Sequence, residues 1–306
     1  MKFSVTILGN NSAIPANGRH PTSQVVTLND QLFLIDCGEG TQMQMNRYKI
    51  KRSKINHIFI SHLHGDHYFG LIGLLNSIGL QNRTTPLHIF APAPLEEIIQ
   101  IQLKCANTHL PFELHFHPLY SGQNGILLKE KGIEISTFPT THRIDCFGFI
   151  FKEKHEERRI LPKEVEKYQI PYTFYKNLKM GEDYIDATGN HIPNEKLTAP
   201  PGKEYTYAFC ADTKYEESII PYIKGVDMIY HETTYLEDNR EKAEARFHST
   251  AIQAAQIAKE AKVKKLLVGH FSSRYYDLEP FAQEAQTIFS NALVSHEGAT
   301  YLIKNG

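Results

Sequence analysis

The densest chemical signal in this sequence is a group of histidine and aspartate residues directly after the apolar run 58–60. The group comprises His62, His64, Asp66 and His67. Side chains two residues apart in an extended segment point the same way, so the first two histidines can share one target. Gly65 then permits a sharp turn that lets Asp66 and His67 face a second position nearby. Because imidazole nitrogen and carboxylate oxygen are preferred zinc donors, this spacing predicts a metal site.

One motif cannot complete two metal sites, so further donors must come from the ends of other strands. His142, Asp212 and His270 each follow a run of β-forming residues. Taken singly, they have other interpretations: a loop histidine, a helix N-cap and a surface residue. Taken together they supply the missing donors, and the carboxylate of Asp212 is suited to bridging two cations.

Such a pair of metal sites favours hydrolysis of a phosphodiester. Two zinc ions roughly 3.5 to 4 Å apart can share a hydroxide, lower its pKa and stabilise the attacking and leaving oxygens of a phosphoryl displacement. The sequence contains neither a G-x-S-x-G elbow nor a Walker-type phosphate loop. Activated water is therefore the expected nucleophile.

His248 is a candidate proton donor for the same reaction. Thr250 and Gln253 form a T-x-x-Q capping box, which predicts a helix start just after His248 and leaves its imidazole on a loop. A pKa in the neutral range suits proton donation to a departing alkoxide. The alternative is an exposed histidine before a helix.

Four residues near these motifs carry weaker hypotheses. Glu232 can hydrogen-bond the His248 imidazole and raise its pKa; otherwise it is a surface acid at a strand end. Ser272 and Arg274 can bind a phosphate, although Arg274 can equally form a structural ion pair. Phe69 can stack on a nucleotide base, but it opens an apolar helix, so we expect it in the core.

The elements that must position these residues are short β-rich runs interspersed with helix-like segments. The runs are 3–8, 24–36, 57–60, 205–210, 228–230 and 264–268, and the helices are 70–79, 95–107, 250–261 and 279–290. The early strands follow one another without helices, whereas the later ones alternate with them. This order predicts sheets flanked by helices, an α/β sandwich, rather than a regular doubly wound fold.

The composition fits one large domain over residues 1–306 that carries an insertion. At 41% hydrophobic, a chain of 306 residues can bury a full core. The net charge of -1 gives no global electrostatic case for a nucleic-acid partner, so any basic footprint must be local. The four cysteines lack C-x-x-C spacing, and no apolar run is long enough for a signal peptide or a membrane span. We therefore expect a cytoplasmic protein without membrane contact, in which Cys37, Cys146 and Cys210 are buried.

Residues 152–201 are predicted to leave the core as an inserted, flexible arm, because they carry many charges and no sustained apolar period. The basic residues are Lys152, Lys154, Arg158, Arg159, Lys163, Lys167, Lys176 and Lys179, interleaved with Tyr168, Tyr172, Phe174 and Tyr175. Acidic residues dilute this charge. A solvated charged face is therefore the alternative to a contact with nucleic acid.

The metal-binding motifs, in this order, resemble those of the metallo-β-lactamase superfamily, and the segment 36–40 resembles that fold's strand-end aspartate and glycine turn. More narrowly, the chain is similar over nearly its whole length to the ribonuclease Z family, the transfer RNA 3′-processing endonucleases. The segments that carry this likeness are Leu8-Gly9-Asn10-Asn11-Ser12-Ala13, His231-Glu232-Thr233-Thr234, Phe247-His248-Ser249-Thr250 and His270-Phe271-Ser272-Ser273-Arg274-Tyr275. The resemblance implies a metallo-β-lactamase-type αββα sandwich.

The resemblance also implies roles for individual residues. One zinc ion would be held by His62, His64 and His142 and the other by Asp66, His67 and His270, with Asp212 bridging them. Asp66 would also orient or deprotonate the water, and His248 would be the general acid for the departing 3′ oxygen. The implied reaction is zinc-dependent removal of the 3′ trailer from precursor transfer RNA by metal-hydroxide attack, which leaves a 3′-hydroxyl.

Members of that family act as homodimers in which the arm of one subunit serves the active site of the other and grips the transfer RNA elbow. This chain departs from the family pattern at two places. It has no glycine near Ile170-Pro171, where a Gly-Pro element is usual, and it has Ala211 where glycine is usual.

Two other functions fit parts of the sequence. A cyclic-nucleotide phosphodiesterase, or another hydrolase of the same fold acting on a small substrate, would keep the metal donors but need neither the arm nor the His248 segment. A non-enzymatic nucleic-acid-binding module should have lost one or more donors, and none is missing here.

Overall fold

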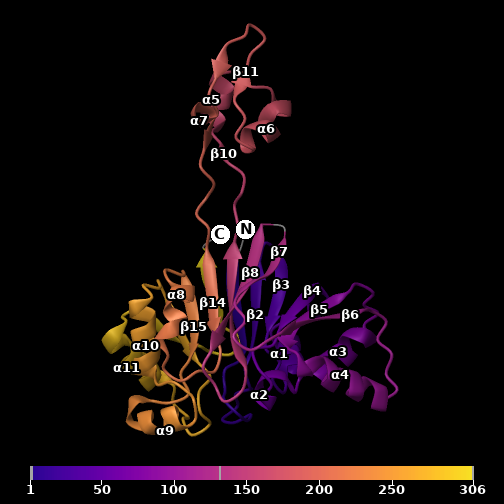
Figure 1. Cartoon of the computed structure of the whole chain (residues 1–306), viewed down its shortest axis with the longest axis vertical. Coiled ribbons are helices and arrows are strands. Elements are labelled where there is room, and N and C mark those ends of the chain that lie inside the picture. The colour runs from indigo at the N-terminus through magenta and orange to yellow at the C-terminus, as the bar shows by residue number, and fades with distance from the viewer. Residues whose placement is uncertain (1–2, 131, 305–306) are drawn as a thin grey trace.

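The computed structural model, which describes residues 3–130 and 132–304, is a four-layer sandwich with a projecting arm (Figure 1). Two seven-stranded sheets stack face to face, and helices cover their outer faces. This architecture confirms the predicted αββα sandwich. Among the described residues, no helix is long and apolar enough to cross a membrane.

The first sheet combines an antiparallel half with a parallel half. Its strands are β1 (Phe3–Gly9), β2 (Ser23–Leu28), β3 (Gln31–Ile35), β4 (Ile55–Phe59), β5 (Leu87–Pro92), β6 (Leu114–Leu119) and β18 (Thr300–Lys304). They lie in the order β18-β1-β2-β3-β4-β5-β6, with β3 to β6 parallel. The helices on this side are α1 (Thr41–Arg47), α2 (Gly65–Tyr68), α3 (Leu71–Leu80) and α4 (Pro94–Cys105). Helices thus also separate the early parallel strands, so the expectation of early strands without helices holds only for β1 to β3.

The second sheet has the order β17-β16-β15-β14-β9-β8-β7. Its strands are β7 (Gly125–Glu130), β8 (Ile133–Thr140), β9 (Cys146–Glu153), β14 (Thr206–Cys210), β15 (Met228–Glu232), β16 (Leu266–Gly269) and β17 (Ala292–Val294). The helices beside it are α8 (Ile220–Ile223), α9 (Arg240–Ala245), α10 (Ala251–Glu260) and α11 (Glu279–Ile288). Strands β14 to β17 are parallel, and β9 runs antiparallel between β8 and β14.

Aromatic side chains fill the space between the two sheets. The ring centroid of Phe59, on β4, lies 5.3 Å from that of Phe149 and 5.5 Å from that of Phe151, both on β9. These rings are fully buried, or nearly so, and each removes a large apolar area from water. Cys37, Cys146 and Cys210 are also buried, as predicted.

The run 24–36, predicted as one β-rich segment, is two strands joined by a tight turn. Asn29 and Asp30 have positive φ angles of 50° and 63°. Two such residues in succession are typical of a type I′ hairpin turn, which matches the right-handed twist of the flanking strands. Strands β5 and β6 fall outside the predicted runs because His88, His115 and His117 interrupt their apolar pattern.

The predicted arm, residues 152–201, begins at the end of β9 and returns to the sandwich before β14. It contains β10 (Arg159–Ile160), α5 (Pro162–Lys167), α6 (Tyr175–Lys179), β11 (Tyr184–Ile185), β12 (His191–Ile192), α7 (Asn194–Leu197) and β13 (Thr198–Ala199). Two connecting segments without regular secondary structure separate this small head from the sandwich (Figure 1). The head has an apolar core of its own, formed by Val165, Ile170, Leu178, Ile192 and Leu197. The elements are too short for their apolar residues to show a period in the sequence.

Candidate metal centre

The predicted donors lie at one edge of the sandwich, because the strands that precede them end there. His62 and His64 follow β4, and His142 follows β8. Asp212 and His270 follow β14 and β16, which are each parallel to β15 between them. Carboxyl ends of parallel strands meet at one edge of a sheet, which is where open α/β sheets commonly place their sites. The donors of both sheets therefore converge.

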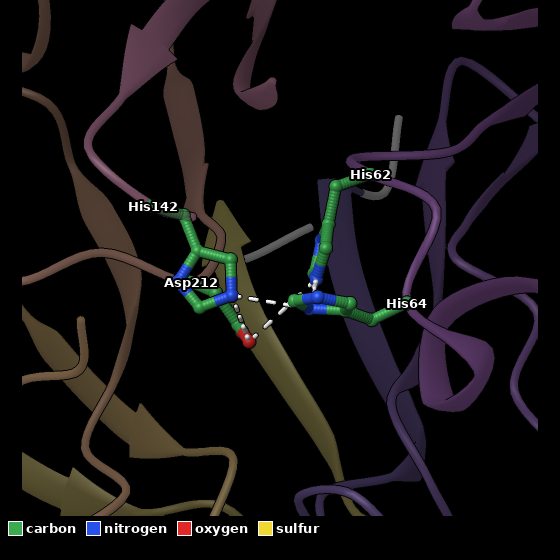
Figure 2. Close-up of side chains that lie close together, drawn as sticks. All are labelled: His62, His64, His142 and Asp212. Atoms are coloured by element: carbon green, nitrogen blue, oxygen red, sulfur yellow. Dashed lines mark hydrogen bonds and ion pairs between the residues drawn. The ribbon is translucent and has the colours of Figure 1, made fainter. Parts of the chain in front are cut away.

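The first donor set consists of His62, His64, His142 and Asp212, whose side chains point toward one another in Figure 2. Nδ1 of His64 lies 3.0 Å from Nε2 of His62 and 3.1 Å from Nε2 of His142. Oδ2 of Asp212 lies 3.7 Å from Nε2 of His62 and 3.8 Å from Nε2 of His142. One imidazole nitrogen of each histidine thus faces a common point.

The second donor set consists of Asp66, His67 and His270, together with the other oxygen of Asp212. Nε2 of His67 lies 3.3 Å from Nε2 of His270. Oδ2 of Asp66 is 3.5 Å and 3.4 Å from these two nitrogens. Oδ1 of Asp212 is 3.6 Å from the His67 nitrogen and 3.3 Å from the His270 nitrogen. The two oxygens of Asp212 are therefore divided between the sets.

The outer nitrogens of these histidines are held by other groups. Nδ1 of His142 donates to the carbonyl oxygen of Phe247 at 2.9 Å. Nδ1 of His67 lies 2.7 Å from Oδ2 of Asp36, and Nδ1 of His270 lies 2.9 Å from Oγ1 of Thr234. Contacts of this kind fix the ring orientation and leave the inner nitrogen free to bind a metal.

The residues present fit a divalent metal ion. Among the described residues, none forms a hydrogen bond to the buried Oδ1 of Asp212, although Nε2 of His270 lies 3.3 Å away. A buried carboxylate oxygen without a partner is costly, and a cation at the centre of the donors would satisfy it. Nitrogen and carboxylate donors are those that zinc prefers.

The buried charges of the site shift the pKa of several donors. Burial alone would lower the pKa of His67, but the carboxylates of Asp66, Asp212 and Asp36 raise it well above the usual value. Burial, reinforced by the neighbouring His67, lowers the pKa of His62 well below the usual value. A neutral His62 imidazole keeps the lone pair that metal binding requires.

Backbone strain accompanies two of the site residues. Asp36 and His270 have φ angles of 53° and 62°, which non-glycine residues rarely adopt. Asp36 compensates by accepting hydrogen bonds from the backbone N–H and the hydroxyl of Ser61, at 2.7 Å and 2.8 Å. The strand-end aspartate recognised in the sequence thus orients His67 and anchors the loop that begins the histidine motif.

The partly buried His248 pairs with the buried Glu232 beside the donors. Oε1 of Glu232 lies 2.9 Å from Nδ1 of His248. Burial alone would lower the pKa of His248, but the charge of Glu232 and this hydrogen bond raise it to about 8. Glu232 is completely buried, so its interpretation as a surface acid is wrong. The predicted capping box is present: Thr250 accepts from the backbone of Gln253, and α10 starts at the next residue after Thr250.

A cavity of about 450 Å³ opens at the donors. Its lining includes His64, Asp66, His142, Asp212, His248, Ser272 and Ser273. Two basic residues that the sequence did not single out, Arg143 and Arg246, also line it. Their only sequence signal is that they lie next to His142 and two residues before His248.

Arg274, the predicted phosphate ligand, is not part of that lining. Its Nη1 donates to Oδ1 of Asn239 at 3.0 Å, and its guanidinium carbon lies 5.4 Å from the ring centroid of Tyr235. Tyr235 itself lines the cavity, whereas Arg274 does not. These contacts agree with a structural role better than with phosphate binding.

Phe69 is exposed, so the expectation that it belongs to the core is wrong. Its side chain is 63% exposed and lines the cavity. The predicted apolar helix begins only at Leu71, so Phe69 lies in the break between α2 and α3 and not on the buried face of α3. At this break Gly70 packs closely on the backbone of Gly38, where a Cβ would overlap a carbonyl oxygen.

Comparison with known proteins finds related sequences along the whole chain. A family model described as Anti-Pycsar protein Apyc1 matches residues 3–161. A protein named Ribonuclease Z from Parabacteroides distasonis is 43% identical over 296 residues, which are 97% of this chain and 97% of that protein. Another from Cytophaga hutchinsonii is 44% identical over 310 residues, covering 100% of this chain and 97% of its own.

Solved structures show the same fold. The short form of human tRNase Z superimposes with a TM-score of 0.73 at 24% identity and covers 99% of this chain and 100% of its own. A metallo-β-lactamase fold protein from Bacillus subtilis gives a TM-score of 0.69 at 19% identity, over 99% of this chain and 100% of its own. The chain thus has the metallo-β-lactamase fold.

Proposed function

This chain belongs to the ribonuclease Z family, and from that membership we propose that it is a metal-dependent endoribonuclease that removes the 3′ trailer of precursor transfer RNA. The observation that carries the proposal is the pair of donor sets sharing Asp212 in a chain that matches its Ribonuclease Z relatives at both ends and through the arm. The Apyc1 model ends at residue 161. The relatives named Ribonuclease Z match beyond that point, through Asp212, His248 and His270, so a hydrolase acting on a small substrate is the less supported alternative.

We propose that the metal is zinc and that two ions bind per subunit. The first would be held by His62, His64 and His142, the second by Asp66, His67 and His270, and Asp212 would join both. When bound, such ions lower the pKa of a water molecule and stabilise negative charge on the phosphate. The division of the two Asp212 oxygens between the sets supports this assignment.

His248 is proposed as the general acid. Because its Nδ1 is held by Glu232, Nε2 is the ring nitrogen left to contact a ligand in the cavity. Donation of its proton to the 3′ oxygen of the transfer RNA as the phosphodiester breaks leaves a 3′-hydroxyl. Asp66, whose Oδ2 accepts from the backbone N–H of Ala13 at 2.7 Å, is proposed to orient the attacking water.

The phosphate is proposed to contact Ser272, Arg143 and Arg246, which line the cavity. Nη2 of Arg143 donates to the carbonyl oxygen of Arg246 at 3.4 Å, so the two basic residues lie together. Two arginines in the cavity lining supply the local positive charge that the overall composition lacks.

Recognition of the transfer RNA is proposed for the arm, residues 152–201, acting as a flexible exosite. Exposed Tyr172, at 83%, and the surrounding lysines offer a surface for stacking and for phosphate contacts. At the position of the family's Gly-Pro element, Ile170 is instead buried in the head. We further propose a homodimer, in which each arm serves the other subunit, and a cytoplasmic location, where precursor transfer RNA is made.

The decisive experiment uses the full-length protein and a precursor transfer RNA with a 3′ trailer. Treatment with a chelator should stop cleavage and added zinc should restore it, with one cut at the trailer junction. Mapping the cut on precursors with and without an encoded CCA then defines the specificity. Cleavage that persists in chelated protein would contradict the proposal.

Deletion of the arm separates this function from the small-substrate alternative. Strands β9 and β14 are antiparallel neighbours, so replacing residues 154–204 by an Asn-Gly turn closes them into a hairpin. This variant should lose cleavage of precursor transfer RNA but still hydrolyse bis(p-nitrophenyl) phosphate. Unchanged turnover of precursor transfer RNA would refute the role of the arm.

A further inference from the structure

Phe69 is a large apolar side chain on the wall of the cavity that the reaction above leaves without a role. It is 63% exposed and lines the cavity together with Gly65 and His64. Single exposed apolar residues are common on protein surfaces, so its exposure alone indicates nothing. Its position beside the metal donors is what indicates a ligand.

The local backbone holds the Phe69 ring in this position. A Cβ on residue 65 would overlap the Phe69 ring, so the ring packs directly against the Gly65 backbone. The ring of Tyr68 meets it edge-on, with centroids 5.0 Å apart and an interplanar angle of 68°. One face of Gly65 and one neighbouring ring thus support an aromatic surface whose remaining area is open to the cavity.

The ring and the proposed general acid both line the cavity but come from elements beside different sheets. Phe69 follows α2, beside the first sheet, whereas His248 precedes α10, beside the second sheet. If the departing 3′ oxygen of the transfer RNA is next to His248, the nucleotide on the other side of the cleaved phosphate extends toward the first sheet. An aromatic ring there meets a base rather than a phosphate.

We propose that Phe69 stacks on the base of the first trailer nucleotide and so positions the scissile phosphate over the metal donors. This inference rests on the proposed function. Stacking on an aromatic ring is available to every base, so Phe69 would hold trailers of any sequence. Such a stacking contact requires the aromatic ring of Phe69 but no polar group on it.

The test is a double-mutant cycle between Phe69 and the trailer base. Phe69→Leu is measured on a normal precursor and on one with an abasic first trailer nucleotide, under single turnover. Loss of one base stack reduces kcat/KM by roughly 5- to 150-fold. We expect Phe69→Leu and the abasic substitution to show similar losses singly and almost no further loss in combination. Losses that multiply would overturn the proposal.

Two controls separate stacking from a structural effect. Phe69→Tyr keeps the ring and should retain activity, whereas Leu302→Ala removes another exposed apolar side chain, 42% exposed on β18, and should change nothing. Zinc content and thermal stability of Phe69→Leu should equal those of the wild type. Failure of the wild type to cut any precursor would instead refute the proposed function itself.

Discussion

Glu232→Gln tests whether the buried carboxylate acts through His248. Oε1 of Glu232 accepts from the backbone N–H groups of Ser249 at 3.1 Å and Thr213 at 3.2 Å, besides its contact with His248. Oε2 accepts from the N–H and the hydroxyl of Thr234, both at 2.9 Å. A glutamine can keep its carbonyl on the Oε1 side, but its NH₂ group then faces the N–H of Thr234.

One buried donor therefore loses its acceptor, at about 1–3 kcal/mol, which a folded domain of ordinary stability tolerates. General-acid catalysis contributes roughly 10²- to 10⁴-fold. Because glutamine still orients the His248 ring but carries no charge, we expect kcat to fall by roughly 10- to 100-fold, with zinc content unchanged. Glu232→Ala, which removes every acceptor, should be much less stable than Glu232→Gln.

The assay is single-turnover cleavage of precursor transfer RNA by Glu232→Gln, His248→Ala and the double variant, with metal content measured on each. His248→Ala should keep its zinc. If Glu232 acts only through His248, the double variant should be no slower than His248→Ala. Loss of metal from Glu232→Gln would refute a role through His248. The same conclusion would follow if adding Glu232→Gln to His248→Ala slowed cleavage by the factor seen in the wild type.

Three further predictions follow from the site and its surroundings. His64→Ala should lose metal and activity together, which elemental analysis of the purified variant would show. Arg246→Ala should lose about 1.4 kcal/mol of binding free energy and so raise KM for precursor transfer RNA roughly tenfold. Arg274→Ala should leave KM unchanged. A raised KM for Arg274→Ala alone would instead identify Arg274 as the phosphate ligand. Burial would raise the pKa of Asp227, but hydrogen bonds, the foremost from Lys203, lower it below 3.8. Because the pKa of Asp227 is lower in the folded than in the unfolded chain, its carboxylate stabilises the fold at a pH above the pKa of the unfolded chain. This stabilisation is lost as the pH falls below that value, so the difference in Tm between the wild type and Asp227→Asn should narrow below about pH 4.

The candidate metal donors could be predicted from the sequence because each lies directly after a buried strand or, for Asp66 and His67, a few residues beyond one. An apolar run that ends in His or Asp places a polar side chain at the edge of a sheet, and the spacing around His62 fixes which side chains share a face. The same logic located His142, Asp212 and His270, although none of these three is informative alone. The contact of Glu232 with His248 was proposed only as a hypothesis, because its place at a strand end fitted a surface acid equally well.

Phe69 and the cavity arginines show what the sequence pattern lacks. Phe69 lies at a break between α2 and α3, where Gly70 meets the backbone of Gly38, a residue far away in sequence. Arg143 and Arg274 are both basic residues near predicted metal-ligand motifs, yet Arg143 lines the cavity, whereas Arg274 lies against the ring of Tyr235 and does not. Which of these side chains line the cavity is determined by tertiary contacts, and these leave no periodic pattern in the local sequence.

The direction of one strand constrains how the arm and the metal donors can act on the same RNA. His142 lies before the start of β9, and the arm leaves from its end, so the eight residues of β9 separate them by roughly 25 Å. In Figure 1 the arm accordingly projects from the edge of the sandwich opposite α2, which carries Asp66 and His67. An arm that points away from its own donors is better placed to serve those of a second copy. Mixed dimers formed from an arm-deleted subunit and a His64→Ala subunit test this, because only exchange between subunits leaves one complete site with an arm.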